Sequence, residues 1–142
     1  MTPTRQGGFL IAKVHQAAGR IFARMLRERG MEIHPAQGRI LFVLWQEGPM
    51  TINELAKRVS LGKSTLTNAL DRLEAAGEAR RVPSPEDRRK IVIQLTPQNK
   101  ATKKLYEEVS QAMTKLFYRG FAGEEITRFE KDLERILGNL GE

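Results

Sequence analysis

Apolar positions spaced three and four residues apart predict helices in the first third of the chain. One helix is expected over residues 8–30, and its apolar face comprises Leu10, Val14, Ala17, Ile21 and Met25. Gly30 is placed to end this helix. A second helix is expected to begin at Pro35, because proline favours the first helical position. Its segment from Ile40 to Trp45 is entirely apolar, which predicts burial on several sides.

Two short helices separated by a turn come next in the pattern. Thr51 and Glu54 have the spacing of a capping box, in which each side chain bonds the backbone N–H of the other residue. Residues 60–62, Ser-Leu-Gly, then interrupt the helical period. Another helix is expected over residues 63–76, and Gly77 is placed to end it. A helix, a tight turn and a second helix in this order form a helix-turn-helix.

The period of the pattern changes from helical to strand-like after this helix. Ile91, Ile93 and Leu95 occupy every second position, and this period of two residues predicts a short strand. With the turn-rich residues 83–87 as a polar tip, residues 79–96 are expected to form a β-hairpin.

Two helices are expected to complete the chain. Thr96 and Pro97 have the character of an N-cap and a first-turn proline, and Gly120 and Gly123 separate the two helices. The predicted fold is mainly α with a small β-hairpin wing (α+β), in one compact chain. Its expected parts are a winged helix-turn-helix over 35–96 and helical arms over 1–34 and 97–142.

The solvent face of the helix expected over residues 63–76 carries short polar side chains, which form helices poorly and therefore point to a functional reason. Their donors and acceptors suit base edges in the major groove of DNA. The candidates for DNA contact are Ser64, Thr65, Thr67, Asn68 and Arg72, with Lys63 and Lys57 as basic neighbours. The alternative is an ordinary solvated face. Asp71 is expected to pair with Arg72 or Lys57, or to stay solvated.

The tip of the predicted hairpin is followed directly by Arg88, Arg89 and Lys90. A basic hairpin beside a recognition helix can reach phosphates or an adjacent minor groove. Neighbours on a strand point to opposite sides, so Arg89 is the main candidate and Arg88 and Lys90 are either DNA contacts or solvated. The same alternative is open for the two arginines that precede the tip, Arg80 and Arg81.

Composition changes this picture only in part. The 142 residues contain 24 Lys and Arg against 17 Asp and Glu, a net charge of +7. This excess favours polyanion partners, but it is larger over residues 1–40 than over residues 51–96. The absence of cysteine excludes disulfides, thiol redox sensing and thiolate metal sites. The longest apolar run is too short to span a bilayer, and no signal peptide is evident. A cytoplasmic protein is expected.

These motifs, taken in order, resemble the MarR family of winged helix-turn-helix transcriptional regulators. The resemblance rests on four segments and covers nearly the whole chain. The segments are Asn53-Glu54-Leu55-Ala56, Ser64-Thr65-Leu66-Thr67, Leu70-Asp71-Arg72-Leu73-Glu74 before Gly77, and Asp87-Arg88-Arg89 leading into Ile93-Gln94-Leu95-Thr96.

The resemblance implies a homodimer whose terminal helices intertwine, with two recognition helices in successive major grooves of a pseudo-palindromic operator. It implies that Arg89 enters the minor groove, steadied by Asp87. It also implies a repressor that a small anionic aromatic effector releases from double-stranded DNA. Two residues depart from the family pattern, which usually has Ser or Thr at the position of His34 and often Gly at the position of Asn99.

Other chemistry finds less support in the sequence. His15 could line an effector pocket together with Phe42 and Trp45, although a core role for the two aromatic residues is the stronger alternative. Neither histidine has partners at metal-ligand spacing, so no metal site and no cofactor are expected. No nucleophile with a base and no paired acids are evident, so an enzyme is not expected. A winged helix that contacts proteins or coats DNA without sequence preference is the remaining alternative.

Overall fold

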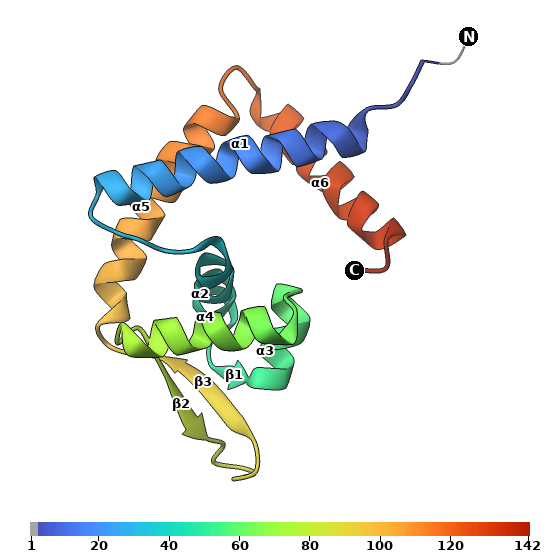
Figure 1. Ribbon diagram of the computed structural model, residues 1–142. Coiled ribbons are helices and arrows are strands. Elements are labelled where there is room, and N and C mark those ends of the chain that lie inside the picture. The colour runs from blue at the N-terminus through green and yellow to red at the C-terminus, as the bar shows by residue number, and fades with distance from the viewer. Residues whose placement is uncertain (1–2) are drawn as a thin grey trace.

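The computed structural model describes residues 3–142. Six helices and three strands follow each other in the order shown in Figure 1. The elements are α1 (Gly7–Glu28), α2 (Pro35–Glu47), β1 (Met50–Thr51), α3 (Ile52–Val59), α4 (Lys63–Ala75), β2 (Ala79–Pro83), β3 (Ile91–Leu95), α5 (Asn99–Phe117) and α6 (Gly123–Asn139). The structure therefore confirms a mainly helical chain with a small β-hairpin wing.

The local signals for helix ends act as the sequence predicted. Thr51 accepts from the backbone N–H of Glu54, whose carboxylate accepts from the N–H of Thr51, both at 3.2 Å. Gly30 and Gly77 have φ values of +79° and +78°, the left-handed conformation that glycine adopts without strain. His34 replaces the family's hydroxyl residue and still caps α2, because its Nδ1 accepts from the N–H of Ala36 at 3.2 Å.

Two features differ from the prediction. The sheet has three antiparallel strands in the order β1-β3-β2 rather than two, because Met50 and Thr51 pair with Ile93 and Val92 of β3. The arm helix α5 begins at Asn99, so the N-cap predicted at Thr96 is wrong. The hydroxyl of Thr96 instead donates to the carbonyl oxygen of Gly77.

The hydrophobic core lies inside the winged helix. Ile40 and Leu41 of α2, Leu55 and Val59 of α3, and Ile93 of β3 are almost completely buried. α4 contributes four buried side chains to the same cluster: Leu66, Ala69, Leu70 and Leu73. This packing fixes which face of α4 is left to solvent.

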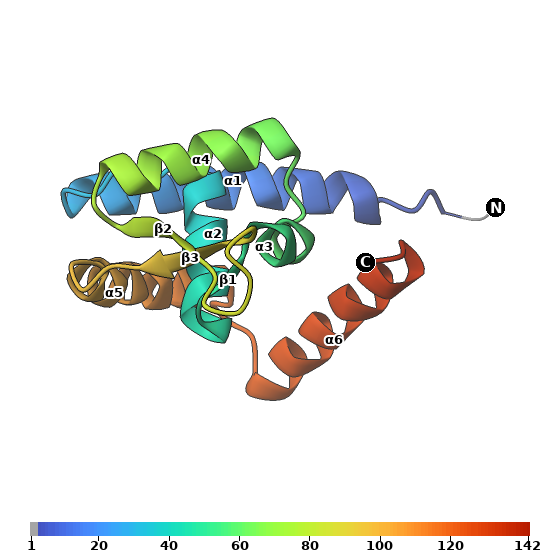
Figure 2. The ribbon, with the colours of Figure 1, turned by 90° about the horizontal axis from the view of Figure 1, so that it is seen from below.

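The arms are built differently from the winged helix. α5 runs from the end of β3 upward and crosses α1, whereas α6 stands clear of the winged helix in both views (Figures 1 and 2). No residue of α6 is buried, and the side chains of Leu137 on α6 and of Leu140 at its C-cap are 51% and 73% exposed. On α1, Phe9 is 64% exposed. The arms therefore present apolar side chains that this single chain does not cover. No helix in the described part of the chain is long and apolar enough to cross a membrane.

Candidate nucleic-acid interface

The recognition helix α4 presents its polar side chains to solvent because its apolar side chains fill the core. Every α4 residue that the sequence nominated for DNA contact is exposed: Lys63, Ser64, Thr65, Thr67, Asn68 and Arg72. The tip of the hairpin lies at the end of the molecule opposite α1 (Figure 1).

Helix α3, which precedes α4, is held in place by contacts at its C-terminal end. Ser60 adopts the left-handed conformation at the end of α3, with a φ of +52°. The guanidinium of Arg39 donates to the carbonyl oxygen of Val59 at 3.0 Å, which satisfies one of the helix's last carbonyls. On the exposed side of α3, Lys57 is solvated, while Arg58 forms an ion pair with Glu47 at 3.0 Å. Lys57 is therefore the better placed of the two for an external anion.

The wing holds Arg89 against Asp87. The Arg89 side chain donates from Nε and Nη2 to the two carboxylate oxygens of Asp87 at 3.2 and 3.3 Å, and its backbone N–H donates to the same carboxylate at 3.1 Å. These hydrogen bonds hold the pKa of Asp87 below its ordinary value of 3.8. Arg89 is nevertheless 91% exposed, so its guanidinium is oriented and still open to a ligand. Arg88 and Lys90 are also exposed.

Arg81 joins the wing to the recognition helix, a contact that was not predicted. Its guanidinium donates to Asp71 at 2.8 Å and to Glu74 at 3.0 Å, and the Arg81 side chain is 26% exposed. The predicted pairing of Asp71 with Arg72 or Lys57 is therefore wrong. The alternation of side chains along β2 could have indicated that Arg81 points inward, because it shares a strand face with Ala79, which is buried against the core.

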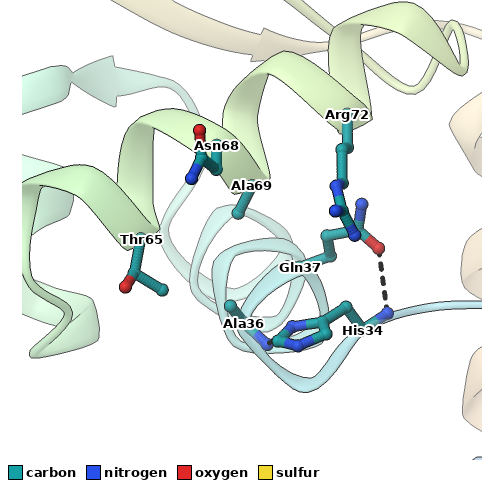
Figure 3. Close-up of a pocket in the computed structure, with 7 residues that line it drawn as sticks. All are labelled: His34, Ala36, Gln37, Thr65, Asn68, Ala69 and Arg72. Carbon is teal, nitrogen blue, oxygen red and sulfur yellow. Dashed lines mark hydrogen bonds between the residues drawn. The ribbon is translucent and has the colours of Figure 1, made fainter.

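A shallow cavity of about 170 Å³ lies between α4 and the start of α2 (Figure 3). Thr65, Asn68 and Arg72 line it from α4, and His34 and Gln37 line it from the other side. Figure 3 shows Arg72 extending toward Gln37, whose side chain accepts from the backbone N–H of His34 at 2.9 Å. Arg72 therefore lies at the boundary between the exposed face of α4 and the segment that connects the arm helix α1 to α2.

A second cavity, of about 450 Å³, continues from this junction. It is lined by Ala23 and Arg27 of α1, by the connection between α1 and α2, and by Arg72. Two guanidinium groups, one from an arm and one from the recognition helix, therefore border a space between arm and winged helix. No local sequence pattern predicts this cavity, because its walls are distant along the chain.

The three residues nominated for an effector pocket lie in different surroundings. His15 is exposed on α1 and Phe42 is 54% exposed on α2, so the core role considered for Phe42 is wrong in this chain. Trp45 is half-buried, packs against the core and donates its indole N–H to Asn99. None of the three lines either cavity described above, and a pocket formed by them stays a prediction. Within residues 3–142, no cluster of His, Asp or Glu that could hold a metal ion is present.

Known proteins are similar to this chain in both sequence and fold. Residues 33–91 match the model of the MarR family. The uncharacterized HTH-type transcriptional regulator YcgE of Bacillus subtilis is 31% identical over 133 residues, which cover 86% of this chain and 80% of that protein. The multiple antibiotic resistance protein MarR of Escherichia coli is 28% identical over 131 residues, covering 92% and 90% of the two chains.

A solved structure agrees with these relatives. The crystal structure of a mutant MarR from Escherichia coli in complex with operator DNA has a TM-score of 0.80 and 27% identity, covering 92% of each chain. The winged helix-turn-helix with helical arms predicted from the sequence is thereby confirmed, and the relatives are transcriptional regulators rather than enzymes. This chain belongs to the MarR family of helix-turn-helix transcriptional regulators.

Proposed function

We propose that this protein is a dimeric, sequence-specific repressor that binds a pseudo-palindromic operator in double-stranded DNA. The observation that carries the proposal is the exposed polar face of α4, in a chain whose wing also presents an exposed arginine that a carboxylate orients. Short donors and acceptors on a rigid helix suit base edges in the major groove. An oriented guanidinium on a hairpin suits the narrow minor groove next to it. Acting on DNA, the protein would work in the bacterial or archaeal cytoplasm, associated with the nucleoid.

The residues of α4 divide into two proposed roles. Asn68 and Arg72 carry the side chains best suited to bidentate contacts with bases, and Ser64, Thr65 and Thr67 add single hydrogen bonds. Lys63, at the start of α4, and Lys57, on α3, are exposed and suit phosphate contacts that fix the register of the protein on DNA. In the wing, Arg89 is assigned to the minor groove and Arg88 to the flanking phosphates.

The exposed apolar residues of the arms support the homodimer. A second copy that covers Phe9 of α1, Leu137 of α6 and Leu140 at the C-cap of α6 would remove apolar surface from water. Two-fold symmetry would then place two recognition helices in successive major grooves, with half-sites about 10 base pairs apart.

Release by a small aromatic anion is the second part of the proposal. The cavity bordered by Arg27 and Arg72 supports it, because an anion held there would engage a guanidinium that is also assigned to DNA. Its volume of about 450 Å³ falls in the range of small-molecule sites. This cavity is a better candidate than the set of His15, Phe42 and Trp45, which do not line it.

Selection of bound fragments from a random DNA pool tests the main proposal. We expect enrichment of an inverted repeat, and we expect Asn68→Ala to change the enriched bases rather than to weaken all sequences equally. Arg89→Ala should lower affinity for the enriched site and reduce the protection of its minor groove at matched salt. A pool without any enriched sequence would contradict the proposal, and unchanged binding by Arg89→Ala would contradict the wing assignment. Adding benzoate-type anions to the complex then tests release.

A further inference from the structure

A buried hydrogen-bond network joins the winged helix to the first turn of the arm helix α5. The indole N–H of Trp45 donates to the amide oxygen of Asn99. The amide nitrogen of Asn99 donates to one carboxylate oxygen of Glu78 at 2.6 Å, and the hydroxyl of Thr102 donates to the other at 2.8 Å. These four residues, here called the joint, come from α2, the turn after α4, and α5.

Asn99 is the centre of the joint and is only 2% exposed. Its amide group is satisfied at both ends, by Trp45 as a donor and by Glu78 as an acceptor. Moving this side chain away would leave the indole N–H of Trp45 and a carboxylate oxygen of Glu78, both in partly buried surroundings, without partners, which is costly inside a protein. A glycine at this position could supply none of these side-chain hydrogen bonds.

Further hydrogen bonds connect the turn after α4 to the residues that lead into α5. The hydroxyl of Thr96 donates to the carbonyl oxygen of Gly77, and its backbone N–H donates to that of Glu78 at 3.0 Å. The side chain of Gln98 donates to the carbonyl oxygen of Ala76 at 3.3 Å. The last carbonyls beyond the recognition helix are therefore held by residues that lead into α5.

The contacts continue from the joint into α1. The ring of Trp45 packs against Tyr106 of α5 with centroids 5.1 Å apart, and Tyr106 packs edge-on against Phe22 of α1 at 5.2 Å. Tyr106 also lies so close to α2 that a Cβ at Gly38 would come within 2.9 Å of its hydroxyl oxygen. Packed side chains thus connect the joint to both arm helices that lie above the winged helix (Figure 1).

We propose that the joint sets the angle between the recognition helix and the dimer arms, and that Asn99 is the positioning residue that fixes the half-site spacing of the operator. The inference rests on the proposed function, a dimer on two half-sites. The 13 residues of α4 extend about 20 Å from the joint at a rise of 1.5 Å per residue. A rotation of about 10° at the joint would therefore move the start of α4 by about 3 Å, close to the rise of one base pair.

A swap of donor and acceptor groups tests this role. Asn99→Asp replaces the donating amide with a carboxylate that faces the carboxylate of Glu78. The two carboxylates repel each other and cannot form a hydrogen bond, so the joint should open. Glu78→Gln alone should keep it closed, because its amide can still accept from Asn99 and can donate to Thr102. In the double variant, the amide introduced at position 78 can donate to the carboxylate introduced at position 99, so the joint should close again. Asn99→Ala is a second way of opening it without added charge.

The readout is affinity for operators whose half-sites are moved apart or together by one base pair. We expect the wild-type protein to prefer one spacing by about tenfold, and Asn99→Asp and Asn99→Ala to reduce this preference to about threefold or less. The double variant should recover the wild-type preference. Val109→Ala, which truncates another buried residue of α5, should lower thermal stability and leave the spacing preference unchanged.

Sedimentation of each variant shows whether the dimer is intact, and circular dichroism shows whether the chain is folded. If folded, dimeric Asn99→Asp and Asn99→Ala keep the wild-type spacing preference, the role of the joint is overturned. Failure of the double variant to recover the preference would overturn it as well. A wild-type protein that binds all spacings equally would overturn the proposed function first, and the role of the joint with it.

Discussion

Arg81 of β2 and Glu74 of the recognition helix α4 are joined by two hydrogen bonds. The guanidinium donates to one carboxylate oxygen at 3.0 Å, and the backbone N–H donates to the other at 3.2 Å. A third hydrogen bond, to Asp71 at 2.8 Å, attaches the same guanidinium one turn earlier on α4. The wing and the recognition helix are therefore fixed to each other, so that the residues proposed to bind major and minor grooves keep one geometry.

Arg81→Ala should lower the free energy of unfolding by about 1 kcal/mol, because it removes a partly buried guanidinium from two carboxylates. The figure is modest, since Asp71 is 60% exposed and Glu74 is 45% exposed to screening water. Arg80→Ala is the matched control. Arg80 is exposed on the opposite face of β2, so its loss should cost less than about 0.5 kcal/mol. Urea unfolding measures both changes, and equal effects would contradict the assignment.

The ion pair of the wing predicts a pH dependence. Hydrogen bonds from Arg89 lower the pKa of Asp87 below 3.8, so the ionised carboxylate is the form that the folded wing stabilises. This contribution is present above the ordinary pKa and is lost only as the pH falls through the lowered value. Titration of the Asp87 carboxyl carbon by NMR should give a midpoint below 3.8, which rises toward 3.8 in Arg89→Ala. Arg88→Ala should leave it low, and a midpoint that Arg89→Ala does not move would refute the pairing.

Tyr118 gives a prediction at alkaline pH. Burial and a 2.7 Å hydrogen bond to the carboxylate of Glu130 raise its pKa from 10.0 to about 12. A raised pKa means that the protonated phenol stabilises the link between α5 and α6, and that this stability is lost as the pH rises from about 10 through about 12. Ultraviolet titration of the phenols should show this high midpoint. Glu130→Gln should lower it part of the way, whereas Tyr118→Phe should leave only the titration of Tyr106, whose pKa burial also raises.

The apolar face of α6 predicts the dimer interface. Leu137→Glu should raise the dimer dissociation constant about 10-fold to 100-fold, because it replaces a side chain that the partner is proposed to bury. Lys131→Glu introduces the same carboxylate on the polar side of α6 and should leave the dimer intact. Analytical ultracentrifugation over a concentration series measures both. Equal dissociation constants for the two variants would place the interface elsewhere.

The elements that could be predicted from the sequence are those with local causes. The capping box of Thr51 and Glu54 and the left-handed glycines at 30 and 77 act within a few residues, and each lies where its pattern placed it. β1 was not predicted, because two residues carry no periodicity and pair only with a strand some 40 positions later. The N-cap expected at Thr96 failed for a related reason, since its hydroxyl bonds Gly77, 19 positions earlier.

The candidate site shows the same division. The polar face of α4 could be predicted because its helical period separates core from solvent within one element. The partner of Asp71 could not be predicted from that helix, since Arg81 reaches it from the adjacent strand. The cavity bordered by Arg27 and Arg72 forms only when α1, α2 and α4 pack together, so no local pattern indicates it, and it is not lined by His15, Phe42 or Trp45.

The ratio of affinities for a selected operator and for a shuffled fragment of the same length, both at physiological salt, tests the central claim most directly. Phosphate contacts alone would give equal affinities, because they carry no sequence information. A protein that reads bases through the face of α4 should prefer the operator by about 1,000-fold or more. Equal affinities for the two fragments would contradict a sequence-specific regulator and favour a winged helix that coats DNA without preference.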